Sequence, residues 1–353
     1  MSDYKAEYNV YKEIHSQGQS WSELIPLIVN QRQAISELFR GVEAVIFAGC
    51  GSGLNASFSA APLFQKATGI FARAIPAAET YLYPGAFLPS GKKILAVLLS
   101  RSGKTSEVAR SLEFFRQNRI PTLGITCTAE SPLAQRSDMA LILTPLSERA
   151  VATTRSLTGM ILAVQLISAL VAKDASFLEE LYLLPEIFEA NQEEYHAQGK
   201  RVGEDTTLSR YAFVGNGPLF GCARESQLKI KEMTLQPSDA YPMFDFRHGP
   251  QSNVSSQMLL TVFMSDTAFQ SEIAFVKDMH ALGGIIWGIC ERADEALPGY
   301  THHLLQLNSG LSELARLPLY LPAVQYMAYY RALTLGLNPD TPQNLAYWIE
   351  SPV

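Results

Sequence analysis

An apolar run passes into small hydroxyl residues and then into an amphipathic helix pattern in LAVLLSRSGKTSEVARSLEFF, residues 95 to 115. The first amides of a helix have no partner inside the helix and can point at an anion, and nearby hydroxyl groups add further donors. A strand-to-helix junction of this composition therefore predicts a phosphate site. Its residues are Ser100, Arg101, Ser102, Gly103 and Thr105.

Two other readings of the glycine-rich turns are weaker. The Walker spacing GxxxxGK[ST] is absent from this loop, which argues against a nucleoside triphosphate. GCGSG at residues 49 to 53 is similar to part of a dinucleotide-binding fingerprint, but the next strand has no acidic residue at the usual place except Glu79. A simple helix cap stays open as the alternative for SRSGKTSE.

A second group of chemical side chains lies in ARESQLKIKEM, where Glu225, Lys229 and Glu232 are spaced i, i+4 and i+7. This spacing puts two carboxylates and one ammonium on the same face of a helix. A carboxylate in a partly desolvated pocket can carry a proton between neighbouring carbons. The pattern alone favours the alternative, a solvated stripe of salt bridges.

Composition bounds the possible partners. The 353 residues are enough for about two domains, and 47% hydrophobic with 18% charged residues is typical of a globular protein. The formal net charge is −6 and there is no basic patch, which argues against nucleic acid or an anionic membrane as partner. We expect a small anionic ligand instead.

The termini and cysteines add little. The N-terminal segment has no apolar core of the secretory type and no stretch is a clean membrane span, so a cytoplasmic location is expected. The four cysteines are far apart, without CxxC or Cys/His clusters, so we predict buried thiols and no metal site.

The chain is organised as a duplicated α/β unit. Gly51 and Gly217, Ser100 and Ser265, and Gly124 and Gly288 stand in matching contexts at offsets of 166, 165 and 164 residues. Short apolar runs alternate with helical patterns, as in βα units around a parallel sheet. The expected strands lie near 44–53, 71–79, 94–100, 122–127 and 139–145 in the first half, and near 211–221, 258–266, 285–290 and 302–308 in the second.

The predicted fold is therefore two tandem domains, each a five-stranded parallel sheet flanked by helices in a flavodoxin-like three-layer sandwich. The second copy has SDTAFQSE where the first has SRSGKTSE, without the glycine, the second serine and the lysine. Only the first copy is expected to bind phosphate.

Six motifs occur along the chain in the order known from one family: GCGSG, SRSGKTSEV, ERAVATTRSLTGM, ARESQLKIKEMT, FRHGPQS and GLNPDTPQNL. The chain thereby resembles the double-SIS-domain sugar-phosphate isomerases and deaminases, including the isomerase half of glucosamine-6-phosphate synthase and the SIS-type glucosamine-6-phosphate deaminases. The resemblance implies a helical segment at 1–35, SIS domains at 36–185 and 200–336, and a tail over the active site at 337–353.

The same resemblance implies the ligand contacts. Ser100, Ser102 and Thr105 match the family's phosphate loop. The sugar would meet Gly51, Ser52 and Gly53, although the synthase has a serine in place of Gly53, and also Thr153, Thr154 and Tyr347. Helix capping is an equally good explanation of Thr153 and Thr154.

Catalytic roles also follow from the resemblance. Glu232 stands at the enolising glutamate, Lys229 at an active-site lysine, and His248 at the ring-opening histidine, which in relatives comes from the neighbouring subunit and so implies a homodimer. Tyr347 replaces a lysine that lies near the sugar C2, and tyrosine can form neither a Schiff base nor a fixed positive charge.

The expected activity is conversion of a hexosamine 6-phosphate to a ketohexose 6-phosphate and ammonia, without metal or organic cofactor. We expect no ammonia transfer from glutamine, because the first strand begins some forty residues into the chain and no N-terminal Cys nucleophile precedes it. Two alternatives remain open. One is a fructosamine-6-phosphate deglycase, and the other is a non-catalytic sugar-phosphate sensor.

Overall fold

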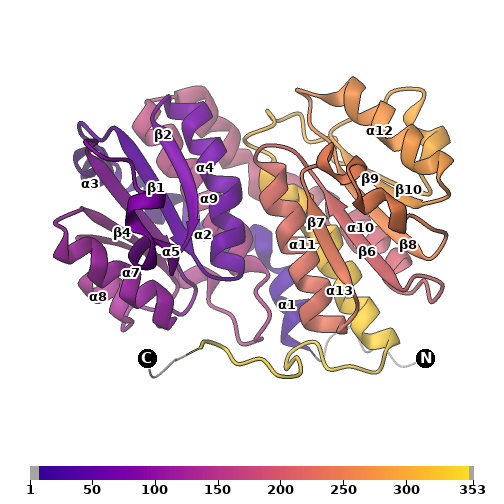
Figure 1. The fold of residues 1–353 in the computed structure, drawn as a ribbon, viewed down its shortest axis with the longest axis horizontal. Helices are drawn as coiled ribbons and strands as arrows, with labels where there is room; N and C mark the ends of the chain where they lie inside the picture. The colour runs from indigo at the N-terminus through magenta and orange to yellow at the C-terminus, as the bar shows by residue number, and fades with distance from the viewer. Residues whose placement is uncertain (1–7, 350–353) are drawn as a thin grey trace. The chain divides into compact units, whose positions relative to one another are not determined.

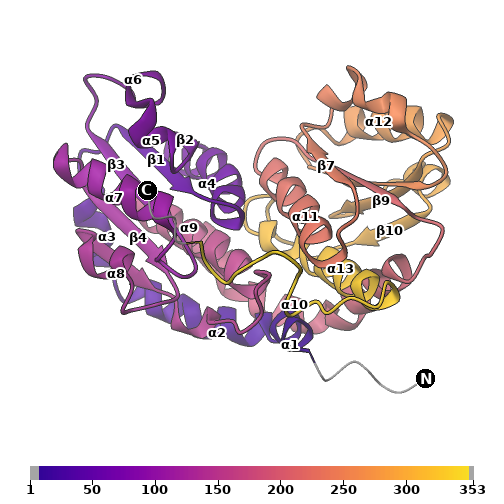
Figure 2. The same ribbon diagram turned by 60° about the horizontal axis from the view of Figure 1, so that its bottom comes forward.

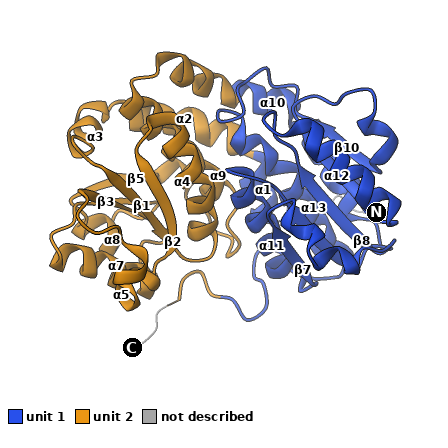
Figure 3. Cartoon of the chain, turned by 45° about the horizontal axis from the view of Figure 1, so that its top comes forward, with its two compact units in different colours: residues 1–15, 186–345 blue, residues 16–185, 346–353 orange. Residues whose placement is uncertain are grey.

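The chain folds into two five-stranded parallel sheets, each flanked by helices (Figures 1 and 2). The structure is a computed structural model that describes residues 8–349. The chain divides into two compact units, which are coloured separately in Figure 3. Unit 1 comprises residues 1–15 and 186–345, and unit 2 comprises residues 16–185 and 346–353.

Unit 2 contains the first sheet, with strand order β2-β1-β3-β4-β5. The apolar runs form parallel strands, of which the three central ones are buried, and the amphipathic segments form the helices that cover them. Its strands are β1 (Ala44–Gly49), β2 (Phe71–Pro76), β3 (Ile94–Leu99), β4 (Thr122–Thr126) and β5 (Met139–Ile142). Its helices are α2 (Gln17–Val29), α3 (Arg32–Leu38), α4 (Ser52–Thr68), α5 (Glu79–Leu82), α6 (Pro84–Phe87), α7 (Ser106–Gln117), α8 (Pro132–Arg136) and α9 (Arg155–Ala172), with the 3-10 turn η2 (Thr144–Leu146).

Unit 1 contains the second sheet, with strand order β10-β9-β8-β6-β7. Its strands are β6 (Arg210–Val214), β7 (Ser238–Tyr241), β8 (Met258–Phe263), β9 (Ile285–Cys290) and β10 (His303–Gln306). Its helices are α1 (Asn9–His15), α11 (Leu219–Thr234), α12 (Phe269–Ala281) and α13 (Pro322–Thr334), with 3-10 turns η3 (Asp245–Arg247), η4 (Pro250–Asn253), η5 (Leu297–Tyr300) and η6 (Leu317–Tyr320). Helix α10 (Ala175–Gly203) contributes residues to both units.

The duplication and the fold class predicted from the sequence are confirmed. Read in chain order within each copy, both sheets have the order 2-1-3-4-5. The turn after the first strand of each copy has a left-handed glycine at the same place, Gly51 with φ +51° and Gly217 with φ +53°. A side chain at Gly49 or at Gly215 would collide with the first turn of the following helix, so both copies need glycine there for the same reason.

In both sheets the chain reverses its direction of winding between the first and third strands of the copy. Strands β1 and β3 are hydrogen-bonded neighbours, with Gly49 opposite Leu99. The GCGSG turn and the SRSGKTSE loop therefore leave the carboxyl ends of adjacent strands. Open parallel sheets bind their ligands at such a switch point.

Helix α9 is the one described helix that is long and apolar enough to cross a membrane by length and composition. Most of it is buried inside the protein, as expected for a core helix. The domain boundaries expected from the sequence remain a prediction. The ends of the predicted N-terminal segment and tail, residues 1–7 and 350–353, lie outside the described residues.

Candidate functional site

The loop after β3 folds back on itself through its own hydroxyl groups. Gly103 N donates to Ser100 Oγ at 3.1 Å, Lys104 N donates to Ser102 Oγ at 3.2 Å, and Ser100 Oγ lies 3.4 Å from Thr105 Oγ1. Gly103 has φ +62°, and a Cβ there would lie 2.1 Å from Ser131 Oγ, so only glycine fits. The predicted phosphate residues thus form one compact loop at the start of α7.

Arg101 differs from the rest of this loop because its guanidinium is paired with a carboxylate of the protein. The side chain is 8% exposed and pairs with Glu148 at 3.1 Å. Its guanidinium also donates to Ala150 O at 3.0 Å and to Val151 O at 2.8 Å. These contacts fix the Arg101 side chain to the segment 148–151 of the protein.

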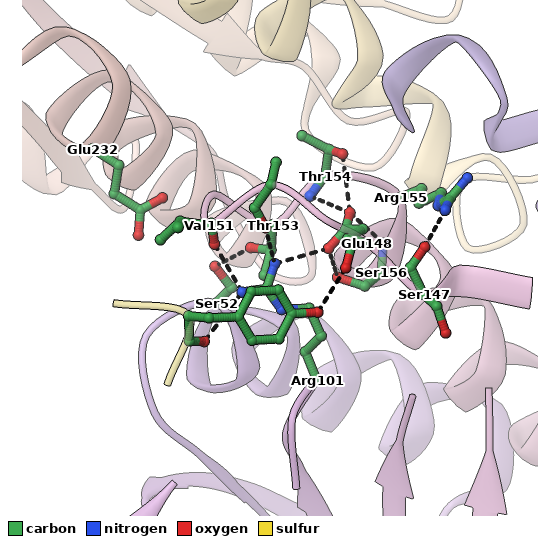
Figure 4. A network of polar contacts seen from close by, with 12 residues as sticks. Ser52, Arg101, Ser147, Glu148, Val151, Thr153, Thr154, Arg155, Ser156 and Glu232 are labelled. Atoms are coloured by element: carbon green, nitrogen blue, oxygen red, sulfur yellow. Dashed lines mark hydrogen bonds and ion pairs between the residues drawn. The ribbon is translucent and has the colours of Figure 1, made fainter. Parts of the chain in front are cut away.

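Glu148, the first residue of the ERAVATTRSLTGM motif, is a buried carboxylate to which the sequence analysis assigned no role (Figure 4). It accepts from Thr154 N at 2.7 Å, Thr154 Oγ1 at 3.0 Å and Ser156 N at 3.1 Å, and also from the Ser156 hydroxyl. Burial alone would raise the pKa of Glu148, but the charge of Arg101 and the hydrogen bonds from Ser156 and Thr154 outweigh it and lower that pKa. Glu148 thereby caps the start of α9.

The turn before α9 contacts the GCGSG turn. Thr153 Oγ1 donates to Ser52 Oγ at 2.6 Å, which joins two of the predicted sugar-binding residues. Thr154 is fully buried and its hydroxyl faces Glu148, and its side chain makes no capping bond to α9. Thr153 and Ser52 are partly exposed and so have the better geometry for a ligand.

The glycine that replaces a family serine has a packing reason. A Cβ at Gly53 would lie 2.4 Å from the carbonyl oxygen of Leu99 in β3. Helix α4 therefore begins in direct contact with the neighbouring strand, which only a glycine permits. Gly51, the left-handed residue of the same turn, is open to solvent with no atom near its missing Cβ.

The part of the tail that belongs to unit 2 lies against the phosphate loop. The ring of Tyr347 covers the Arg101 guanidinium at 3.9 Å, and its hydroxyl donates to Glu148 O at 2.9 Å. Ser106 N, the first amide of α7, donates to Ile349 O at 3.2 Å. The tail thus supplies a carbonyl to the helix start that is predicted to face phosphate.

In unit 1 the charged face of α11 is buried, so the exposed-stripe alternative is wrong. Lys229 and Glu225 are each 1% exposed and pair at 3.2 Å, and Lys229 also pairs with Glu232, which is 18% exposed. Burial alone would lower the pKa of Lys229, but Glu225 and Glu232 outweigh it and raise that pKa. A charged ammonium therefore holds a carboxylate that is only partly open to solvent.

His248 lies in the loop between η3 and η4 and is exposed. Its backbone N donates to Asp245 O at 2.9 Å, and the next residue, Gly249, has φ +122°. Its imidazole forms no hydrogen bond with another side chain or with the backbone among residues 8–349. The side chain is available for a ligand or another chain.

The second copy of the phosphate loop is already occupied by a carboxylate of its own unit. Asp266 N, Thr267 N and Thr267 Oγ1 donate to Glu313 Oε2 at 2.9, 3.1 and 3.1 Å. Ser265, the counterpart of Ser100, donates through N and Oγ to Glu272 at 2.7 and 3.0 Å. These donors of the second loop thus already have a carboxylate acceptor, and phosphate binding by the first copy alone stays a prediction.

Among residues 8–349, no three His, Cys, Asp or Glu side chains are grouped so that they could hold a metal ion. All four cysteines are free thiols. Burial raises the pKa of Cys50 to about 12 and that of Cys290 to about 12.

Comparison with known proteins gives a consistent relationship. Residues 38–170 match the family model described as SIS domain. The glutamine–fructose-6-phosphate aminotransferase of Chlamydia caviae is 27% identical over 96% of this chain, which spans 58% of that relative's length. The chain thus spans a little over half of the curated relatives it matches.

Solved structures share the fold over nearly the whole chain. A glucosamine-6-phosphate deaminase from Thermotoga maritima is 25% identical with a TM-score of 0.76, covering 97% of this chain and 99% of the other. A tagatose-6-phosphate ketose/aldose isomerase from Escherichia coli has a TM-score of 0.86 at 23% identity, covering 95% of each chain. The second likeness carries information on the fold alone.

Proposed function

We propose that this chain, which contains a SIS domain over residues 38–170, is a sugar-phosphate isomerase that also deaminates its substrate. The substrate would be a hexosamine 6-phosphate and the products a ketohexose 6-phosphate and ammonia. The observation that carries the proposal is the buried Lys229, which holds the partly exposed carboxylate of Glu232.

Phosphate anchoring falls to the loop after β3. The hydroxyls of Ser100, Ser102 and Thr105 and the amides at the start of α7 supply neutral donors, which suit a dianion at a helix N-terminus. Ser52 and Thr153, joined by a hydrogen bond at the carboxyl end of the same sheet, are proposed to contact the sugar hydroxyls.

The proton transfer falls to Glu232. In the open-chain aldose its carboxylate takes the proton from C2, and the electron pair moves onto the C1 carbonyl oxygen. This oxygen takes up a proton from the solvent, and an enolamine forms. The proton returned to C1 gives a ketimine, to which water adds, and ammonia leaves to yield the ketose. Lys229 orients Glu232, because its ammonium pairs with that carboxylate.

Ring opening is proposed for His248, whose exposed imidazole can move a proton between the ring oxygen and the C1 hydroxyl. We further propose a homodimer in which His248 serves the site of the partner subunit. Tyr347 takes no part in imine chemistry, since a phenol cannot form a Schiff base.

A substrate panel tests the proposal. Glucosamine 6-phosphate, galactosamine 6-phosphate, tagatose 6-phosphate and fructosyl-lysine 6-phosphate are incubated with the protein, and ammonia and ketose 6-phosphate are measured in parallel. Release of ammonia and ketose phosphate in equal amounts from one hexosamine is the expected result. Cleavage of the lysine adduct alone would make the protein a deglycase, and binding without turnover would make it a sensor.

A further inference from the structure

Arg101 lies in the predicted phosphate loop, yet its guanidinium donates its hydrogen bonds to oxygens of the protein. Nη1 donates to Glu148 Oε2 and Ala150 O, and Nη2 donates to Val151 O and, at 3.3 Å, to Tyr347 O. Four protein oxygens thus surround one guanidinium that is 8% exposed. A phosphate would have to displace several of these bonds to reach it.

The second copy shows the same connection with its charges exchanged. At the duplication offset of 165 residues, Asp266 is the counterpart of Arg101. Asp266 pairs with Arg316, which is fully buried and lies in the segment before α13, as Glu148 lies in the segment before α9. Both copies therefore tie the loop after the third strand to the segment before the last helix by one ion pair.

The ion pair in the second copy indicates that this connection does not depend on a bound phosphate. The second loop holds its own carboxylate, Glu313, and still keeps the ion pair. At the same offset Glu313 is the counterpart of Glu148 and Arg316 that of Val151, so the two copies connect the same segments by ion pairs that differ in position and polarity. An ion pair at this place therefore does not require a positive charge in the loop. What the ion pairs of the two copies share is that each connects the loop after the third strand to the segment before the last helix.

In the first copy this connection extends to the tail. Tyr347 lies over the guanidinium at 3.9 Å and donates to the backbone oxygen of Glu148, and Lys104 lies 5.0 Å from the ring of Trp348. Cation–π contacts are stronger where the cation is partly desolvated, as Arg101 is. The tail therefore contacts the protein at the place where the Arg101–Glu148 pair joins the phosphate loop to the turn before α9.

We infer that Arg101 and Glu148 are a positioning pair that fixes the phosphate loop, the turn before α9 and the tail segment 347–349 on one another, and that phosphate is bound by hydroxyls and amides instead. Tyr347 docks the tail on this pair. The inference rests on the proposed function only for its effect on turnover, since the docking can be measured without any reaction.

The test compares R101Q with E148Q. A direct phosphate ligand and a nearby carboxylate act on an anion with opposite sign, so R101Q would weaken inorganic phosphate binding and E148Q would tighten it. A positioning pair predicts that both substitutions change the Kd for inorganic phosphate in the same direction, weakening it about two- to fivefold. Opposite directions would overturn the inference. Titration calorimetry on the whole protein gives both constants.

Trp348 supplies the readout for docking. Of the three tryptophans, Trp21 and Trp287 are fully buried, while Trp348 is 38% exposed. R101Q, E148Q and Y347A should each increase acrylamide quenching of the exposed component. R101K should increase it too, because an ammonium lacks the planar fork that reaches Glu148 Oε2 and the carbonyl oxygens of Ala150 and Val151 together. Unchanged quenching in all three variants would contradict the role of the pair.

D266N is the matched control, since it removes the counterpart ion pair in the second copy from an exposed carboxylate. It should leave phosphate binding and Trp348 quenching unchanged. If wild-type protein turns over none of the sugar phosphates but the quenching results stand, the proposed function fails and the positioning inference survives. Y347A keeps the pair intact, so it tests docking even where R101Q does not fold.

Discussion

Replacement of Lys229 by methionine tests the electrostatic core of the proposed site. The change keeps the length and apolar body of the side chain and removes the ammonium that pairs with Glu225 and Glu232. Removing one member of a buried ion pair costs about 3 to 5 kcal/mol, because the remaining charge stays desolvated. Glu225 is 1% exposed and is the carboxylate that would be affected most.

The loss should depend on pH in a defined direction. Without Lys229, burial raises the folded-state pKa of Glu225 above its unfolded value. The variant therefore loses stability as pH rises from the unfolded-state pKa of Glu225 to its raised folded-state pKa. The slope is at most about 1.4 kcal/mol per pH unit. Urea unfolding of wild type and K229M at pH 5 and pH 7 measures the difference, which should be larger at pH 7.

Two further variants sharpen this result. In E225Q/K229M the buried carboxylate is gone, and part of the lost stability should return. K200M is the matched control, because Lys200 and Glu204 form an exposed pair at 3.8 Å whose removal should cost less than about 1 kcal/mol. A loss below about 1 kcal/mol in K229M, equal at both pH values, would refute the reasoning.

The remaining predictions concern single sites in each unit. Burial raises the pKa of Glu272 from 4.5 to about 7, so its contribution to stability falls as pH rises through that interval, by at most about 3 kcal/mol, and E272Q should flatten this part of the stability-pH curve in urea unfolding. G53S places a Cβ 2.4 Å from Leu99 O and should lower stability by about 1 to 3 kcal/mol, measured by urea unfolding, with a loss below about 0.5 kcal/mol counting against the close approach. E313A leaves the amides of Asp266 and Thr267 without their acceptor and should lower the thermal midpoint without changing phosphate affinity, whereas a tenfold change in that affinity would show that the second loop takes part in binding.

The fold was predictable because its signals are repetitive. Buried parallel strands give continuous apolar runs, and the duplication supplies each run twice. The structure confirms two sheets with one strand order. Strand β7 was missed, since Ser238–Tyr241 is four residues long, largely polar and only partly buried, which gives neither an apolar run nor an alternation.

The environment of the site residues was less accessible from the sequence. A spacing of i, i+4 and i+7 is the same for an exposed stripe and for the buried Lys229 cluster, and only the packing around α11 separates them. Glu148 carries no signal of its own, because its partner Arg101 is 47 residues away and in a different motif. The contact of Tyr347 with Arg101 is likewise invisible, since it joins residues 246 positions apart.

The most direct measurement is turnover of the preferred hexosamine 6-phosphate by wild type and E232Q in deuterium oxide. Because the protonated Glu232 exchanges with the solvent before it protonates C1, the wild-type ketose acquires deuterium at C1, and E232Q releases ammonia at least about 100-fold more slowly. E194Q, an exposed helical glutamate of the same unit, should match wild type. Ammonia release by E232Q within about threefold of wild type, with deuterium still entering C1, would contradict the assignment of Glu232 as the base.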